Sequence, residues 1–484
     1  MTSIIKGIAS RSKPTAADDP NEMIIQTEDE ICRMYDEWQI EERDIDLNVT
    51  LSETANNLAA IWKSCAHGMG ATRFYGTEAT VGPGDRAPNV AKAAFLGSLM
   101  LQLHHPPAKD STSSSIGHAA PHSLVLRRPK TYSPVPMPKV LLDWLNTSHM
   151  PQFADLQALK ELEPNPTASS NFWEIINSGV LRGRFSDVAE ILRSADFNYA
   201  RSALEDGLPQ AGYRGTQLQN IQRCVNKLLQ ILEMCPGFQR GNWDVRDAEW
   251  SMYRKRIVTA VTDLEEFAEG EDQPTDIPAS GNRFQAVNFG LGSAPGQRNL
   301  SFTQSARMAE SRVPWAIYQN VKSVYRIMLG DVGTITSRAQ DWVEASIGLT
   351  VWWDGEDDGE TSGQNDGFGA STIGDKSFRM SKSQSAGTAS DDPRGAYLAR
   401  IGLAYRNVTS DAPDAGFRIN SLSPIEVGLA SVFEGNTEGV VELLQTWSLC
   451  VASAVAEVSS AGGWFDSTEG KMAGFNEDDL MVLS

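Results

Sequence analysis

A glycine separates two helix-like stretches in the sequence LRGRFSDVAEILR, which runs from Leu181 to Arg193. The same arrangement returns as FEGNTEGVVELLQ, from Phe433 to Gln445. Aligning the two stretches matches five pairs of residues: Gly183 with Gly435, Val188 with Val440, Glu190 with Glu442, Ile191 with Leu443, and Leu192 with Leu444. We interpret the repeat as a structural unit in which a glycine hinge joins two antiparallel helices.

The first copy carries signals for a helix end and a new helix start. Residues 171–182 place apolar side chains on one helical face, and Asn171 with Glu174 has capping-box spacing. Gly183 can adopt the left-handed conformation that closes a helix. Ser186 and Asp187 then predict the cap and the acidic first turn of the next helix.

The second copy uses similar devices. Ser423, Pro424 and Glu426 supply a cap, a first-turn proline and a capping-box acid, and an apolar stripe follows. Gly435 ends the predicted helix. Gly183 and Gly435 are therefore the predicted structural hinges.

Apolar residues at helical spacing recur through most of the chain, and alternating strand patterns are almost absent. The one alternating stretch, Ile45 to Leu51, would be a single short strand, which cannot form a sheet. The sequence predicts an all-α protein. Further helices are expected near residues 28–43, 53–67, 89–104, 138–147, 152–162, 217–234, 244–269, 303–311, 315–329, 336–352, 394–407 and 447–460.

Four stretches rich in Gly, Pro, Ser or Asp interrupt the helical pattern, and the longest, Asp354 to Asp392, has too few apolar residues to offset the entropy of ordering it. Helix pairs that cannot bury their own stripes are stable when neighbouring pairs stack, which predicts an irregular α-solenoid. The other three interruptions are Gly70 to Pro88, Pro106 to Pro136, and Glu271 to Leu300.

Composition excludes several classes of partner. The formal net charge of −20 argues against direct nucleic-acid binding, which requires clustered Lys and Arg. No signal peptide and no apolar run of membrane-spanning length occur, so no membrane insertion is expected. The five scattered cysteines fit a reducing compartment better than a disulfide framework.

The motifs that resemble ligand sites are incomplete. The glycine-rich GLGSAPG at Gly290 to Gly296 has the wrong spacing for a dinucleotide loop and follows no strand. The acidic stretch from Asp354 matches the first positions of a calcium loop, but its twelfth position is Asn365 instead of a bidentate acid. We interpret both stretches as loops.

Histidines and tryptophans suggest two further candidates. His104, His105, His118 and His122 are close in sequence, but no cysteine is nearby and a proline breaks the local geometry, which favours a surface loop over zinc. The pair Trp352 and Trp353 is interpreted as packing at a helix end. No catalytic motif occurs, so we predict no catalytic residue, no metal site and no cofactor.

Three stretches resemble a fungal member of the Nup85 nucleoporin family: NFWEIINSGVLRGRFSDVAEILRS, AQDWVEASIGLTVWWDGEDD and SPIEVGLASVFEGNTEGVVELLQTWSLCVASAVAEVSSAGGWF. The resemblance extends from about Ile24 to Phe465. It implies an ancestral coatomer element, a helical fold with a trunk, a crown where the chain makes a U-turn, and a tail.

The resemblance also implies a location and partners. Members of the family belong to the Y-shaped outer-ring complex of the nuclear pore, at the nuclear envelope, and support protein and mRNA transport indirectly. They bind other Y-complex nucleoporins and, through a donated β-blade, a seven-bladed-type β-propeller subunit. About twenty residues precede the first predicted helix and lack hairpin alternation, so the blade is expected to be missing and the chain to be a monomeric trunk-and-crown fragment.

The resulting interpretation is one α-helical solenoid domain over residues 24–465, with a disordered insertion at 354–392. Residues 1–23 are expected to be a disordered or cloning-derived segment, and residues 466–484 a C-terminal tail. The predicted function is a non-enzymatic scaffold of the nuclear pore. A vesicle-coat scaffold of related fold and an all-α enzyme with a pocket between helices remain the alternatives.

Overall fold

The computed structural model describes residues 5, 7, 19–40, 47–68, 81–84, 86–109, 133–149, 153–269, 312–355, 393–410 and 416–464. Within those ranges the chain forms helices, no strand, and one isolated bridge between Ala108 and Pro134. The predicted all-α, solenoid-like fold class is confirmed. None of the described helices is long and apolar enough to cross a membrane.

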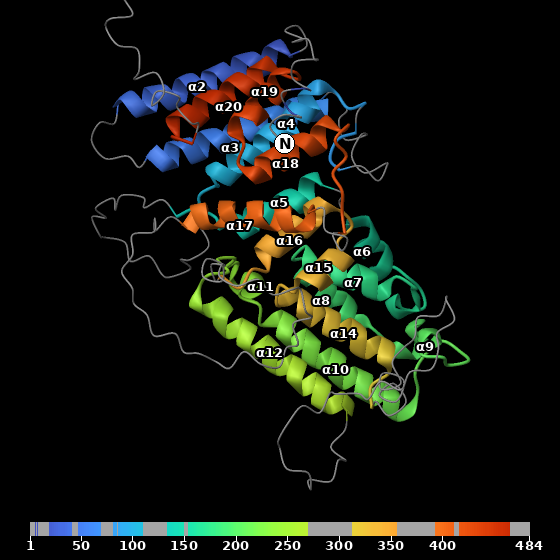
Figure 1. Cartoon of the computed structure of the whole chain (residues 1–484). Helices are drawn as coiled ribbons and strands as arrows, with labels where there is room; N and C mark the ends of the chain where they lie inside the picture. Colours follow the sequence, from blue (N-terminus) through green and yellow to red (C-terminus); the bar gives the residue numbers. More distant parts are fainter. Residues whose placement is uncertain are drawn as a thin grey trace, which may run out of the picture.

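The chain runs away from its first helices and then returns to them, so that sequence-distant helices lie side by side (Figure 1). Three early helices contact three late ones, and we call this group the closed end. Its members are α2 (Asn21–Ile40), α3 (Leu47–Gly68), α4 (Asn89–His104), α18 (Pro424–Glu434), α19 (Thr437–Gln445) and α20 (Leu449–Ala461).

The opposite end of the molecule is the place where the chain reverses, and we call it the turning end (Figure 1). Here two long antiparallel helices pack against a third. The turning end consists of α10 (Gly215–Glu233), the short α11 (Pro236–Arg240), α12 (Ala248–Glu269) and α14 (Trp315–Met328).

A middle layer connects the two ends. Helix α5 contacts α4 on one side and α16 on the other, and α7 contacts α14. The middle layer comprises α5 (Met137–Ser148), α6 (Phe153–Lys160), α7 (Phe172–Leu181), α8 (Phe185–Ser194), α15 (Val332–Arg338), α16 (Trp342–Val351) and α17 (Pro393–Val408). The short η3 (Pro166–Ala168), η4 (Phe197–Tyr199) and α9 (Ser202–Glu205) lie between α6 and α10 in the chain.

All ten residues of α16 and twelve of the sixteen residues of α4 are buried, because apolar or small side chains occupy most of each helix surface. Gly97 of α4 allows a close approach at the closed end: a Cβ atom there would lie 2.9 Å from Val451 of α20 and 3.3 Å from Trp62 of α3. The small residue therefore allows α20, which is distant in the chain, to pack closely on α3 and α4.

One possible strand is absent from the described residues, and one expected helix is divided in two. Leu47 to Leu51 begins α3 instead of forming a strand, because residues four apart share a helical face and Leu51 is buried there. The helix expected at 336–352 is two helices, since Asp341 caps a new start at Trp342 by accepting a hydrogen bond from the Glu344 amide. The expected helix at 303–311 lies outside the described residues.

Two predicted caps are also wrong. The side chain of Asn171 caps no amide of α7, and α8 begins at Phe185, which places Ser186 inside the helix. The downstream copy was predicted correctly in its start: Pro424 is in the first turn, and Ser423 accepts a hydrogen bond from the Glu426 amide. The Glu426 carboxylate instead accepts hydrogen bonds from the Asn420 amide and the Trp342 indole.

Candidate functional site

Both predicted hinge glycines have left-handed backbone conformations. Gly183, with φ of 67°, follows the end of α7, and Gly435, with φ of 75°, follows the end of α18. Their surroundings differ, because a Cβ atom at Gly183 would lie 2.8 Å from Leu142 and 3.1 Å from Trp243, whereas a Cβ atom at Gly435 would meet nothing within 4 Å. Only Gly183 combines a turn with close packing.

Next to Gly183, four charged or titratable side chains meet in the interior, and we call them the buried junction: Arg182, Glu344, His149 and Asp341. The Arg182 Nε donates to Glu344 Oε1 at 2.6 Å, and the two side chains are 1% and 0% exposed. His149 Nε2 lies 2.8 Å from Asp341 Oδ2. The junction thus joins the ends of α5 and α7 to the start of α16.

Further hydrogen bonds hold the buried junction in place. Arg182 Nη1 donates to the His149 carbonyl at 3.2 Å, and the Gln340 amide donates to Glu344 Oε2 at 2.8 Å. Burial disfavours the charged form of Asp341, but His149 and the Glu344 amide lower the pKa of this carboxyl below its ordinary value. Arg182, Glu344 and His149 are buried and Asp341 is only partly exposed, so we interpret the junction as a structural link.

The first two candidate zinc ligands have aromatic partners. His104 stacks on Trp464 with ring centroids 3.8 Å apart, and His105 Nε2 accepts a hydrogen bond from the Trp464 indole at 2.8 Å. Burial, with a contribution from Arg394, lowers the pKa of His104 to about 3 and that of His105 to about 4. His118 and His122 lie outside the described residues, and the described part of the chain contains no cluster of three metal-binding side chains.

Of the remaining candidate motifs, the structure describes the tryptophan pair but not the two loops. Trp352 and Trp353 are buried, as the packing interpretation predicted, and Trp352 lies edge-on to Phe185 and Trp250. The glycine-rich stretch at 290–296 and the insertion from residue 356 to 392 lie outside the described residues.

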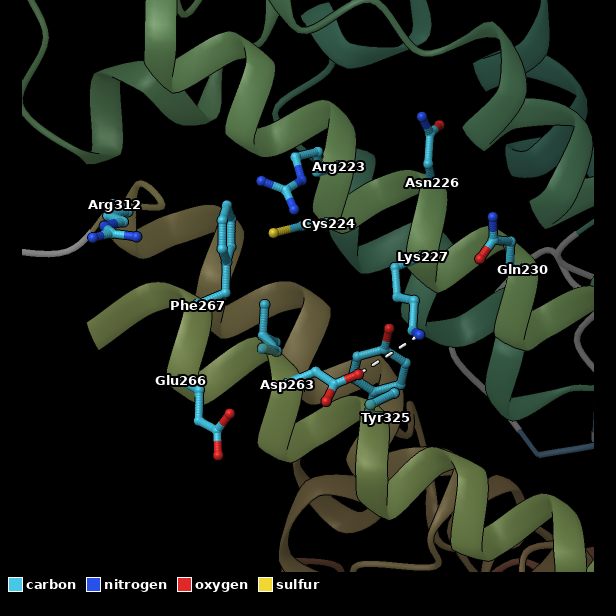
Figure 2. Close-up of a pocket in the computed structure, with 12 residues that line it drawn as sticks. Arg223, Cys224, Asn226, Lys227, Gln230, Asp263, Glu266, Phe267, Arg312 and Tyr325 are labelled. Atoms are coloured by element: carbon cyan, nitrogen blue, oxygen red, sulfur yellow. Dashed lines mark ion pairs between the residues drawn. The ribbon is translucent and has the colours of Figure 1, made fainter. Parts of the chain in front are cut away.

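A groove of about 630 Å³ lies at the turning end between α10 and α12, with α14 as its floor (Figure 2). Leu264, Cys224 and Tyr325 are its buried apolar or weakly polar base, and Tyr325 is 1% exposed. The rim is charged: Lys227 Nζ lies 3.6 Å from Asp263 Oδ2, and the guanidinium of Arg223 lies 4.8 Å from the centre of the Phe267 ring. We call this feature the α10–α12 groove.

The α10–α12 groove is suited to binding instead of nucleophilic chemistry. Burial raises the pKa of the Cys224 thiol to about 11 despite the nearby Arg223, so the thiol is protonated at neutral pH. Burial also raises the pKa of Tyr325 above its ordinary value. Neither group is ionised, and no histidine lines the groove to activate one.

Sequence reasoning missed both the groove and the buried junction. The residues of the junction come from positions 149, 182, 341 and 344, and no local pattern indicates which charged side chains will meet. The groove depends on how far α10 and α12 lie apart over α14, which helical periodicity does not encode. The only available signal was an apolar stripe on α10 and α12 interrupted by Cys224 and flanked by basic residues.

The folded-back helices, with glycines at close contacts, define an all-α, solenoid-like class of protein. A model of the Nup85 nucleoporin family matches residues 131–211. The nucleoporin NUP85 of Chaetomium thermophilum is 32% identical over 474 residues, an alignment that covers 96% of this chain and 38% of that protein. The chain belongs to the Nup85 nucleoporin family, whose place is the nuclear pore complex in the nuclear envelope.

Proposed function

We propose that the chain is a structural element of the Y-shaped outer-ring complex, where it holds neighbouring nucleoporins at fixed positions. The observation that carries the proposal is the closed end, where helices from both ends of the described chain share one core. A chain that closes on itself in this way resists bending, because separating its ends exposes a continuous apolar interior. Transport of protein and mRNA would depend on this rigidity indirectly.

Membership of the Nup85 family supports the proposal that the chain assembles with other nucleoporins. The chain spans 38% of the length of the relative that it matches, so the activity and partners of a whole nucleoporin are proposals for this chain. We propose other Y-complex nucleoporins as partners, and a seven-bladed-type β-propeller subunit held by a donated blade. We also propose that residues 24–465 form a single domain.

The proposal is tested by the location of the protein in cells and by the proteins that co-purify with it. A fluorescent fusion of the full-length protein should mark the nuclear rim, and its purification under native conditions should recover outer-ring nucleoporins in constant ratio. A variant with Glu344→Ala, which removes the carboxylate that pairs with the buried Arg182 guanidinium, should reduce both signals. A diffuse wild-type fusion, or recovery of vesicle-coat subunits instead of nucleoporins, would refute the proposed function.

A further inference from the structure

The hydroxyl of Tyr325 is a hydrogen-bond donor at the base of the α10–α12 groove. The Tyr325 side chain as a whole is 1% exposed, but its hydroxyl is not among the buried polar atoms and makes no hydrogen bond with a described residue, so it opens to the groove. Figure 2 shows this hydroxyl directed into the space between α10 and α12, beside the Lys227–Asp263 ion pair. A hydroxyl that faces a groove without a protein partner retains its donor for a ligand.

A second observation concerns the rim. Arg223 lies over the face of Phe267 and makes no ion pair with any residue in the described part of the chain. The guanidinium of Arg223 therefore retains donors for a carboxylate. Glu266 of α12, which also lines the groove, is directed away from Arg223 in Figure 2.

Together these groups describe one ligand chemistry. Arg223 and the Tyr325 hydroxyl both donate hydrogen bonds, so the matching group is an acceptor with negative charge, a carboxylate. Between them lie Phe267, Leu264 and Cys224, which suit an apolar stem or ring. The site thus fits a carboxylate and an apolar side chain presented close together.

We propose that the α10–α12 groove is the docking site for an acidic amphipathic helix of a partner protein. One carboxylate of that helix binds Arg223 and accepts a hydrogen bond from Tyr325, and an apolar side chain one turn away packs against Phe267 and Leu264. The groove runs along two antiparallel helices and is open along its mouth, which is the geometry of helix-in-groove recognition.

The net charge of −20 does not oppose this occupant. Charges beyond about 8 Å are screened at physiological salt, so the local field of the groove decides the contact. Arg223, Lys227 and Arg312 outnumber the two acids, Asp263 and Glu266, that line the groove. An acidic helix therefore meets a locally basic surface on an acidic protein.

The experiment uses two probes on the intact chain. The first is 3-(4-fluorophenyl)propanoate, followed by fluorine NMR, with its uncharged amide as the matched ligand control. The second is a blocked helical peptide with Glu and Phe four residues apart, and the same peptide with Gln in place of Glu. We expect saturable binding of both acids, at least tenfold weaker binding of the amide and the Gln peptide, and weakening by added salt.

Variants locate the site. Tyr325→Phe should weaken both acids about fivefold and Arg223→Gln about tenfold, with unchanged melting temperatures. Arg240→Gln, an exposed arginine of α11, is the matched control and should bind as the wild type does. Because the peptide also contacts the length of the groove, it should bind at least tenfold more tightly than the small acid.

Four results would overturn the proposal. They are the absence of saturable binding, equal binding by the acid and its amide, equal binding by wild type and both groove variants, and a peptide no tighter than the small acid. Binding that appears only after residues 272–308 are replaced by a Gly–Ser linker would identify the chain's own segment as the occupant. Binding that dissociates a dimer of this chain would identify a second copy.

Discussion

Helix α4 at the closed end buries twelve of its sixteen residues, whereas α10 at the turning end buries six of its nineteen. The two helices occupy different packing positions. Helix α4 is surrounded by α3, α5, α18, α19 and α20, while α10 packs its apolar stripe inward and leaves its other face to solvent. A helix therefore forms part of the core at the closed end and part of the surface at the turning end.

Small residues account for much of the contrast. Gly97 and Gly428 let neighbouring helices approach at the closed end, where a Cβ atom at Gly428 would lie 2.8 Å from Leu96 and 2.9 Å from Leu443. At the turning end, the large side chains of Phe267 and Tyr325 line a groove between helices. The comparison teaches that rigidity and recognition are divided between the ends, with the buried junction between them.

The largest expected effect comes from breaking the buried junction. Glu344→Ala should destabilise the protein by about 3 to 5 kcal/mol, because it removes the carboxylate that pairs with the buried Arg182 guanidinium. Urea unfolding measures the change. The double variant Arg182→Met/Glu344→Leu should recover most of the loss, since it removes both charges. A double variant as unstable as the single one would show that the pairing does not couple the two regions.

The second-largest expected effect is a loss of stability at low pH, which should arise at the closed end. The pKa values of His104 and His105 are about 3 and about 4 in the fold, below the ordinary 6.5, so the unfolded chain takes up protons that the folded chain excludes. Their contribution is complete above pH 6.5 and is lost as the pH falls toward about 3, with a total on the order of a few kcal/mol. The free energy of unfolding should therefore fall between pH 7 and pH 4.5.

The control for acid is the double variant His104→Gln/His105→Gln. It removes both titrating rings that contact Trp464, so its stability should change less over the same pH interval. Parallel stability curves for the variant and the wild type would contradict the account of the closed end.

A smaller loss of stability is expected when a side chain is added at a crowded glycine, and the same change at an open glycine provides the comparison. Gly97→Val should cost about 1 to 3 kcal/mol, because the new side chain meets Val451 and Trp62. Gly395→Val on α17 is the matched control, since a Cβ atom there meets nothing within 4 Å. Equal losses in chemical denaturation for the two variants would remove close packing as the explanation.

The two hinge glycines give the smallest expected difference. Gly435→Ala should cost about 1 kcal/mol, which is the strain of an L-residue at positive φ. Gly183→Ala should cost about 1 kcal/mol more, because its Cβ would also press on Leu142 and Trp243. Thermal melting of both variants measures the difference, and an unchanged melting curve for either would argue against its predicted role as a hinge.

Helices were predictable because their signals are local. Residues 89–104 were predicted as a helix and α4 has those bounds, and Ser423 was correctly recognised as a cap. Asn171 failed as a cap because its backbone, with φ of −97° and ψ of 12°, is not in the extended conformation that brings a side chain onto the first amides. A cap depends on backbone angles as well as residue type.

The candidate sites were not predictable, because they arise between distant parts of the chain. Arg182 and Glu344 are separated by 162 residues. The sequence around each residue does not indicate whether its charged side chain is buried or exposed. Tyr325 follows the apolar stripe of α14 and reads as an ordinary core residue. That its hydroxyl faces a groove depends on the separation of α10 and α12, which only the tertiary structure provides.

The central claim is that the first and last described helices share one core, and a cut chain tests it most directly. A protease site placed within residues 356–392 would divide the chain after α16 and before α17. The account predicts that the two pieces stay together in size-exclusion chromatography and unfold in a single transition, because α18, α19 and α20 pack on α2, α3 and α4. Separation of the pieces in native buffer would contradict it.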